Sequence, residues 1–130
     1  MGLERGKPTV IEAQAAPAPP VKRARGARMA VLIGPEQGAP NFITRRFLLA
    51  PGAHIPAHRH PTIEHEQVMV RGEMVLGIDD QVRVVRAGDA MYLPALAQHP
   101  HGHVTAIAGR AAPALAAQWG IQHAFDSYEE

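Results

Sequence analysis

The sequence predicts an all-β protein, organised as an antiparallel sandwich or barrel. Short apolar runs alternate with turn signals along most of the chain, and no segment shows the periodicity of a convincing amphipathic helix. Glycine and proline, with 12 of each among 130 residues, provide the frequent turns that such a fold needs. The length suits one domain with a single hydrophobic core.

Eight segments are predicted as strands because each is short, rich in apolar residues and bounded by turn signals. In chain order they are Met29–Ile33, before Gly34-Pro35; Phe42–Ala50, before Pro51-Gly52; Gln67–Arg71, before Gly72; Met74–Ile78, before Asp79-Asp80; Val82–Arg86, before Gly88-Asp89; Ala90–Leu93, before Pro94; His103–Ile107, before Gly109; and Leu115–Trp119. Ala111–Gln118 also has helical propensity, but Trp119 and its apolar neighbours favour a strand at a barrel edge.

Residues 1–27 are expected to form an N-terminal arm, ahead of a barrel domain at 28–120 and a tail at 121–130. Ala13–Pro20 is rich in alanine and proline, which favours neither a helix nor a buried strand. A basic cluster follows, made of Lys22, Arg23, Arg25 and Arg28. A solvated arm explains this cluster better than a nucleic-acid or membrane contact. The arm is either flexible or exchanged between subunits, with Thr9–Ile11 as an added edge strand.

The composition excludes several classes of function. A net charge of +1 gives no large field that would attract nucleic acid. No run approaches the roughly 18 apolar residues of a membrane span, and the start lacks a signal-peptide core, so we expect a cytoplasmic protein without a membrane partner. Cysteine is absent, which removes disulfides and thiolate chemistry. Ser127, the single serine, lies in the tail and is no plausible nucleophile.

Four histidines carry the strongest functional signal. His58, His60 and His65 lie close together in the sequence, and His99 follows 34 residues after His65. Side chains alternate along a strand, so His58 and His60 project from one face. Imidazole nitrogen binds Zn, Cu, Fe and Ni near physiological pH. The pattern predicts a metal site at which these four side chains converge.

Two motifs built on these residues resemble those of the cupin superfamily. The first cupin motif is G-x5-H-x-H-x3,4-E-x6-G, and Gly52, His58, His60 and Gly72 match it, with His65 at the glutamate position. The second is G-x5-P-x-G-x2-H-x3-N. It is matched by Gly88, Pro94 and His99, while Leu96 replaces the glycine and His103 the asparagine. The resemblance covers roughly residues 30–119 and implies a small antiparallel β-barrel of the jelly-roll, or double-stranded β-helix, type.

His65 departs from the usual cupin pattern in a chemically meaningful way. The site resembles the four-histidine variety found in some single-domain cupins, which implies one divalent transition metal per chain: Mn, Fe, Ni, Cu or Zn. An imidazole in place of a carboxylate leaves more positive charge on the ion and strengthens its Lewis acidity. Glu64 and Glu66 flank His65, so a shift of one residue would restore a carboxylate ligand.

Other residues are expected around the metal. Gln67 and Met69 share the parity of His65, so they should point into the barrel, as a hydrogen-bonding group and an apolar wall. Gln67, Glu66 and Tyr92 are the candidate catalytic residues; Tyr92 is either a proton donor or a core aromatic. One of Arg45 and Arg46 must face inward on its strand, where it would anchor a carboxylate, unless both end at an exposed edge.

The resemblance implies a metal-dependent enzyme acting on a small molecule. An oxygenase-type oxidoreductase is the leading hypothesis, because such a reaction needs no protein nucleophile. The alternatives are an isomerase or lyase of a sugar, uronate or small carboxylate, and a cupin that binds a metal or ligand without turnover. Open sheet edges also predict a homodimer.

Overall fold

The structure is a computed structural model that describes residues 6–58, 65–78, 81–93, 104–108 and 114–121. Strands dominate this part of the chain. They are β1 (Arg25–Ile33), β2 (Phe42–His58), β3 (His65–Arg71), β4 (Glu73–Ile78), β5 (Gln81–Arg86), β6 (Ala90–Leu93), β7 (Val104–Ala108) and β8 (Ala114–Ile121), with one 3-10 turn at Pro35–Gln37. Every pairing between these strands is antiparallel. The predicted all-β class is confirmed.

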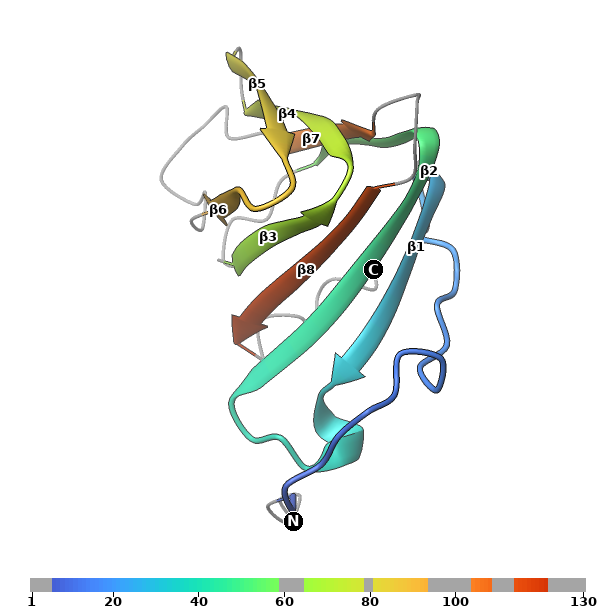
Figure 1. The fold of residues 1–130 in the computed structure, drawn as a ribbon, viewed down its shortest axis with the longest axis vertical. Helices are drawn as coiled ribbons and strands as arrows, with labels where there is room; N and C mark the ends of the chain where they lie inside the picture. Colours follow the sequence, from blue (N-terminus) through green and yellow to red (C-terminus); the bar gives the residue numbers. More distant parts are fainter. Residues whose placement is uncertain (1–5, 59–64, 79–80, 94–103, 109–113, 122–130) are drawn as a thin grey trace.

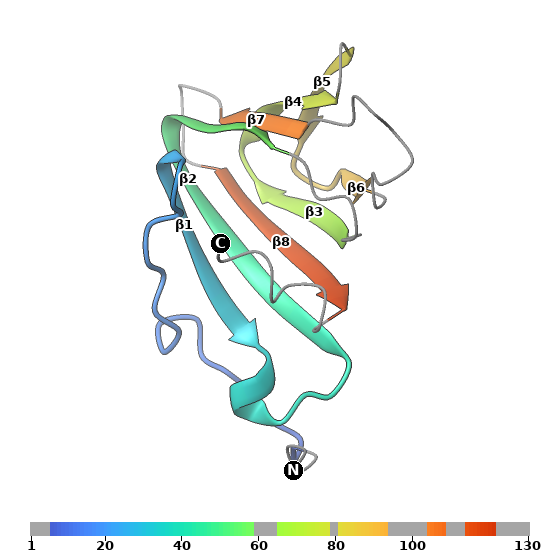
Figure 2. The same ribbon diagram turned by 180° about the vertical axis from the view of Figure 1, so that it is seen from behind.

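The strands form one eight-stranded hydrogen-bonded sheet that bends at β2 into two parts, here called the large and the small sheet. The hydrogen-bonded order is β5-β4-β7-β2-β8-β3-β6, and β1 pairs with β2 outside this path. The large sheet contains β1, the first half of β2, β8, β3 and β6. The small sheet contains the second half of β2, β7, β4 and β5. Figures 1 and 2 show β2 running the length of the large sheet and then bending across into the small one.

The bend in β2 corrects one boundary of the sequence prediction. Phe42–Ala50 was expected to end at Pro51-Gly52, but the strand continues to His58. Gly52 has a φ of 75°, in the left-handed region that glycine enters without steric cost. The chain therefore turns from pairing with β8 to pairing with β7 without leaving the strand.

The other strands agree with the prediction to within a few residues. β1 begins at Arg25 rather than Met29, so the barrel starts inside the segment assigned to the arm. β3 begins at His65, two residues before the predicted start. The last segment is the strand Ala114–Ile121, which confirms the choice of strand over helix. In the described ranges, no helix is long and apolar enough to cross a membrane.

The core lies between the two sheets. Its buried residues come from both: Leu49, Met69, Met91 and Ala116 from the large sheet, and Met74, Leu76 and Val85 from the small one, with Ala27 and Ala53 beside them. Met69 is 1% exposed, as expected for an apolar wall. Three methionines in this cluster suit an irregular space between bent sheets, because an unbranched thioether adapts its shape.

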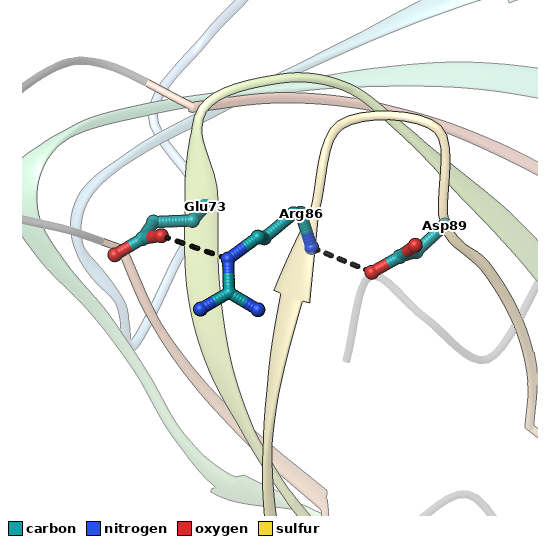
Figure 3. A network of polar contacts seen from close by, with 3 residues as sticks. All are labelled: Glu73, Arg86 and Asp89. Carbon is teal, nitrogen blue, oxygen red and sulfur yellow. Dashed lines mark hydrogen bonds and ion pairs between the residues drawn. The ribbon is translucent and has the colours of Figure 1, made fainter.

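The turn between β5 and β6 ties the second motif to β3. Gly88 has a φ of 92°, which explains why the motif has glycine there. Its N–H donates to the carbonyl of Met69 (2.8 Å), and the N–H of Met69 donates to the carbonyl of Asp89 (3.0 Å). The Asp89 carboxylate accepts the N–H of Arg86 at 2.8 Å (Figure 3). This turn holds β6 in register beside β3.

The described part of the arm lies along the outer side of β1 and β2. Nη2 of Arg46 donates to the carbonyl of Ala13 (3.0 Å), and Nη1 of Arg28 donates to that of Ala18 (3.1 Å). The N–H of Met29 donates to the carbonyl of Pro19 (3.1 Å). Ala30, on the outer side of β1, is fully buried. The arm thus packs on its own barrel.

Candidate metal centre

Two strand pairings flank the segments that contain the predicted ligands. His58, at the end of β2, pairs with Val104, at the start of β7. His65, at the start of β3, pairs with Leu93, at the end of β6. The segment 59–64 connects His58 to His65 in the sequence, and the segment 94–103 connects Leu93 to Val104. The residues at the ends of the two connections are therefore paired, once on each sheet.

The backbone register places both described ligand positions on the inner side of the sheets. His65 pairs with Leu93 on one neighbouring strand and with Gly120 on the other, and Gly120 pairs in turn with Ile43. Leu93 and Ile43 are buried at 6% and 5% exposure. Residues directly opposite on paired strands share a face, so position 65 belongs to the face that lines the core.

Position 58 is placed by the same argument on the small sheet. His58 pairs with Val104, which in turn pairs with Ile78 on β4. Position 78 has the parity of Leu76, which is buried at 5% exposure. A register shift after Ile55 adds one residue to β2 and brings position 58 onto this face.

His60 and His99 lie outside the described residues, as does Glu64. Within the described residues, no three histidine, aspartate or glutamate side chains gather around one point. The four-histidine assignment stays a prediction. It gains one structural argument, because His60 lies in the first of the two connections and His99 in the second.

The three candidate catalytic residues fall on two different faces. Gln67 and Met69 follow His65 at two-residue steps; Met69 is buried and Gln67 half-buried, as expected for the inner side. Glu66 and Tyr92 pair with each other across β3 and β6, and both are exposed, Tyr92 at 59%. The structure therefore places Glu66 and Tyr92 on the outer side of the large sheet.

The structure also decides which arginine faces inward. Arg45 is 4% exposed and has the parity of buried Ile43, Phe47 and Leu49. Arg46 points to the outer side, where it binds the arm. Apolar residues at the odd positions of this strand were a signal for this choice, since a period of two assigns the odd set to the core.

Sequence reasoning did not find a row of polar positions that crosses the large sheet. Gln118 on β8 pairs with Arg45 on one side and with Gln67 on the other. Positions 45, 118 and 67 thus form one polar row across the large sheet, next to the row that contains His65. Pairing between distant strands defines this row, so no local pattern could have shown it.

A groove of about 480 Å³ lies elsewhere, between the arm, β1 and β2. It is lined by Pro20, Ala24, Gly26, Ala27, Arg28, Leu48, Leu49 and Ala50. None of the predicted ligands or catalytic residues takes part. This groove carries too few polar groups to suggest chemistry, and the inner face of the barrel remains the candidate site.

Comparisons with known proteins agree with the barrel that the motifs imply. The family model of the cupin domain matches residues 45–111, more than half of the chain. The polyketide cyclase RemF from Streptomyces resistomycificus has a similar structure, with a TM-score of 0.78 and 21% identity over 88% of this chain and 80% of that one. No curated protein sequence matches this chain.

Two further solved structures share the fold. A predicted oxalate decarboxylase from Thermotoga maritima has a TM-score of 0.69 and 18% identity, over 88% of this chain and 99% of that chain. A recombinant oxalate oxidase in complex with glycolate has a TM-score of 0.64 and 21% identity, over 82% of this chain and 56% of that chain. At these identities the likeness concerns the fold alone.

Proposed function

Because the chain belongs to the cupin domain family, we propose that it is a metal-dependent enzyme, an oxygenase-type oxidoreductase acting on a small organic substrate at a mononuclear four-histidine centre. The observation that carries this proposal is the double pairing of His58 with Val104 and of His65 with Leu93. The two connections between these pairs contain His60 and His99. Both connections start and end at these paired positions, which supports a common site for the four histidines.

The donor set fits a divalent transition metal. Imidazole suits Zn, Cu, Fe and Ni, and the absence of cysteine leaves no thiolate that would select softer ions. A bound ion supplies Lewis acidity and, if it is redox-active, oxidation chemistry. His58, His60, His65 and His99 are the residues that would hold it.

The chain's own residues shape the substrate side of this centre. Gln67 lies two residues along β3 from His65, on the same face, so its amide can donate to or accept from a bound substrate. Met69, the next inner residue, forms the apolar wall. Glu66 and Tyr92, with their exposed positions on the outer side, are left out of the proposed chemistry.

A second candidate is Lewis-acid chemistry without oxygen, as in an isomerase, lyase or cyclase. The structural likeness to a polyketide cyclase favours keeping it beside the oxidoreductase, since oxalate oxidase shares the same fold. Both reactions need a divalent ion and a polar inner wall. They differ in whether dioxygen is consumed.

The test begins with protein purified without a metal-affinity tag. Elemental analysis should find about one divalent transition metal per chain, since one site is predicted. Turnover of small organic acids is then followed on the same material, with and without oxygen. Oxygen consumption coupled to turnover supports the oxidoreductase, whereas equal turnover without oxygen supports the second candidate. Metal binding without any turnover contradicts both.

Two adjacent residues test the ligand assignment directly. His65→Ala removes a predicted ligand on β3, and Glu66→Ala removes the exposed carboxylate next to it. We expect His65→Ala to lower metal affinity by at least about tenfold and Glu66→Ala to leave it unchanged. Loss of metal in Glu66→Ala with retention in His65→Ala would show that a carboxylate is the ligand.

A further inference from the structure

The groove between the arm, β1 and β2, here called the arm groove, is separate from the candidate metal centre. Its volume of about 480 Å³ falls within the range of small-molecule sites in proteins. Most of the described residues that line it are apolar or glycine: Pro20, Ala24, Gly26, Ala27, Leu48, Leu49 and Ala50. Arg28 completes the lining and is the one charged residue in it. An apolar wall with a single cation suits a molecule that is apolar along its length and anionic at one end.

Arg28 is held in place but keeps free donors. Its Nη1 donates to the carbonyl of Ala18 at 3.1 Å, and its backbone forms a bridge to Pro20. A guanidinium has five N–H donors, so this side-chain bond leaves most of them for a ligand. Within the described residues Arg28 forms no ion pair. Its planar donor fork therefore matches an incoming carboxylate.

The loop that leads from Pro20 to Arg28 adds positive charge at the same end of the arm groove. The N–H of Val21 donates to the carbonyl of Ala27 at 2.9 Å, so the two ends of the loop meet. The loop contains no acidic residue and carries three exposed cations: Lys22, Arg23 and Arg25. Such a cluster raises the local concentration of anions.

Arg23 has a backbone conformation that favours glycine. Its φ is 63°, and among the described residues no other side chain has a positive φ. The turn is closed by the N–H of Ala24, which donates to the carbonyl of Val21 at 3.4 Å. A side chain in this region costs free energy that glycine would not, and such local strain often marks a functional position. An arginine here is explained if its charge has a use at the arm groove.

We propose that the arm groove binds a medium-chain carboxylate, with its alkyl tail on the apolar wall and its carboxylate at Arg28. Lys22, Arg23 and Arg25 attract the anion and favour this orientation. The arm forms one wall and the barrel the other (Figures 1 and 2), so a bound molecule contacts both. This site is independent of the proposed metal chemistry, because none of the predicted metal ligands lines it.

Three ligands test the tail and the charge separately by titration calorimetry on the full chain. Decanoate should bind about tenfold more tightly than octanoate, because two further methylene groups are buried. Decyltrimethylammonium has the same tail with the opposite charge, and it should bind at least about tenfold more weakly than decanoate. Equal affinities of the two carboxylates, or of the two ligands with a decyl tail, would overturn the proposal.

A pair of substitutions at Ala50 tests the location. Ala50 lines the arm groove and is exposed, so a polar side chain fits there without disturbing the core. Glutamate and glutamine have the same size and differ in charge. Ala50→Glu should bind decanoate at least about tenfold more weakly than Ala50→Gln, because a carboxylate in the wall repels that of the ligand. Equal affinities of the two variants would place the ligand elsewhere and overturn the proposal.

Two arginine substitutions test the anchor. Arg28→Gln should lower the affinity for decanoate about tenfold, because it removes a charge-assisted contact. Arg83→Gln, at an exposed position of β5 outside the arm groove, should leave the affinity unchanged. Unchanged binding in Arg28→Gln would overturn the anchor, and an equal loss in Arg83→Gln would reduce the effect to net charge.

Arg23→Gly separates a binding role from a structural one. Glycine relieves the backbone strain, so this variant should unfold at the same or a higher denaturant concentration, while decanoate binds severalfold more weakly. A loss of stability with full decanoate affinity would show that Arg23 serves the fold instead. Vesicles of anionic phospholipid are the last control. Binding to vesicles that decanoate does not inhibit would assign the cations to a membrane surface and overturn the proposal.

Discussion

At the scale of single residues, the side on which a residue lies separates structural positions from candidate functional ones. Gln67 and Glu66 are adjacent in sequence, yet Gln67 is half-buried on the inner side and Glu66 is exposed on the outer side. The same alternation separates Arg45 from Arg46. A strand thus presents consecutive polar residues to two environments, of which only one can meet a substrate in the barrel.

Metal binding should depend on pH. Imidazole must lose its proton before it can bind, so protons compete with the metal, and affinity should fall as pH drops through about 6.5, the ordinary pKa of histidine. Metal content after equilibration at graded pH measures this. Retention unchanged down to pH 4 would indicate carboxylate ligands instead.

Two histidine substitutions should separate ligand from bystander. His60→Ala should reduce metal occupancy sharply but leave the barrel folded, because the fold rests on apolar packing distributed over many strands, whereas one ligand contributes mainly to metal affinity. His103→Ala should change occupancy much less, since position 103 lies beyond the ligand spacing of the motif. Metal analysis and circular dichroism of both variants test this. Equal metal loss in the two would mean that the fourth ligand is wrongly assigned.

At the scale of elements, the turn between β5 and β6 shows how a motif position acts through its backbone. Gly88 provides the left-handed conformation, and Asp89 closes the turn on the N–H of Arg86. Arg86 also contacts Glu73 at 3.6 Å, but the two side chains are 67% and 56% exposed (Figure 3). An exposed ion pair contributes little, whereas a turn hydrogen bond fixes the register of β6 beside β3.

Two carboxylate substitutions test this difference. Asp89→Ala should lower the free energy of unfolding by about 1 kcal/mol, because it leaves the Arg86 N–H without its carboxylate acceptor. Glu73→Ala should change it by less than about 0.5 kcal/mol, since the ion pair is screened by solvent. Chemical denaturation of both variants measures these values. A larger effect of Glu73→Ala would assign the stability to the ion pair instead.

At the scale of the whole molecule, the shared strand β2 joins the two sheets. Its first half belongs to the sheet that contains His65, and its second half carries His58 into the opposite sheet. How the two described ligand positions, 58 and 65, lie relative to each other therefore depends on the bend at Gly52 and on the pairing that follows it. The outer side of the large sheet is partly covered by the arm, but Val70 and Tyr92 remain exposed at 48% and 59%.

We propose that the protein is a homodimer, in which a second copy of the chain covers Val70 and Tyr92 on the outer side of the large sheet. Thr9–Ile11, the edge strand expected for subunit exchange, belongs to no strand within the described single chain, and its exchange stays a prediction. Light scattering should give twice the chain mass in the micromolar range. Val70→Glu should shift the mass to a monomer, and Val82→Glu, on edge strand β5, should not. A monomer before any substitution would contradict the dimer.

The sequence by itself determined the strand content, most strand positions and the inward direction of Met69, because these depend on alternation over a few residues. It also supplied the histidine spacing and the motif glycines, whose backbone conformations are local properties. The tertiary structure alone decided that β2 continues through Gly52. The tertiary structure also decided that His58 pairs with Val104 and His65 with Leu93, the residues at the ends of the two predicted ligand segments. These features follow from hydrogen bonds between strands far apart in the chain, and no local pattern encodes which distant strand will pair with which.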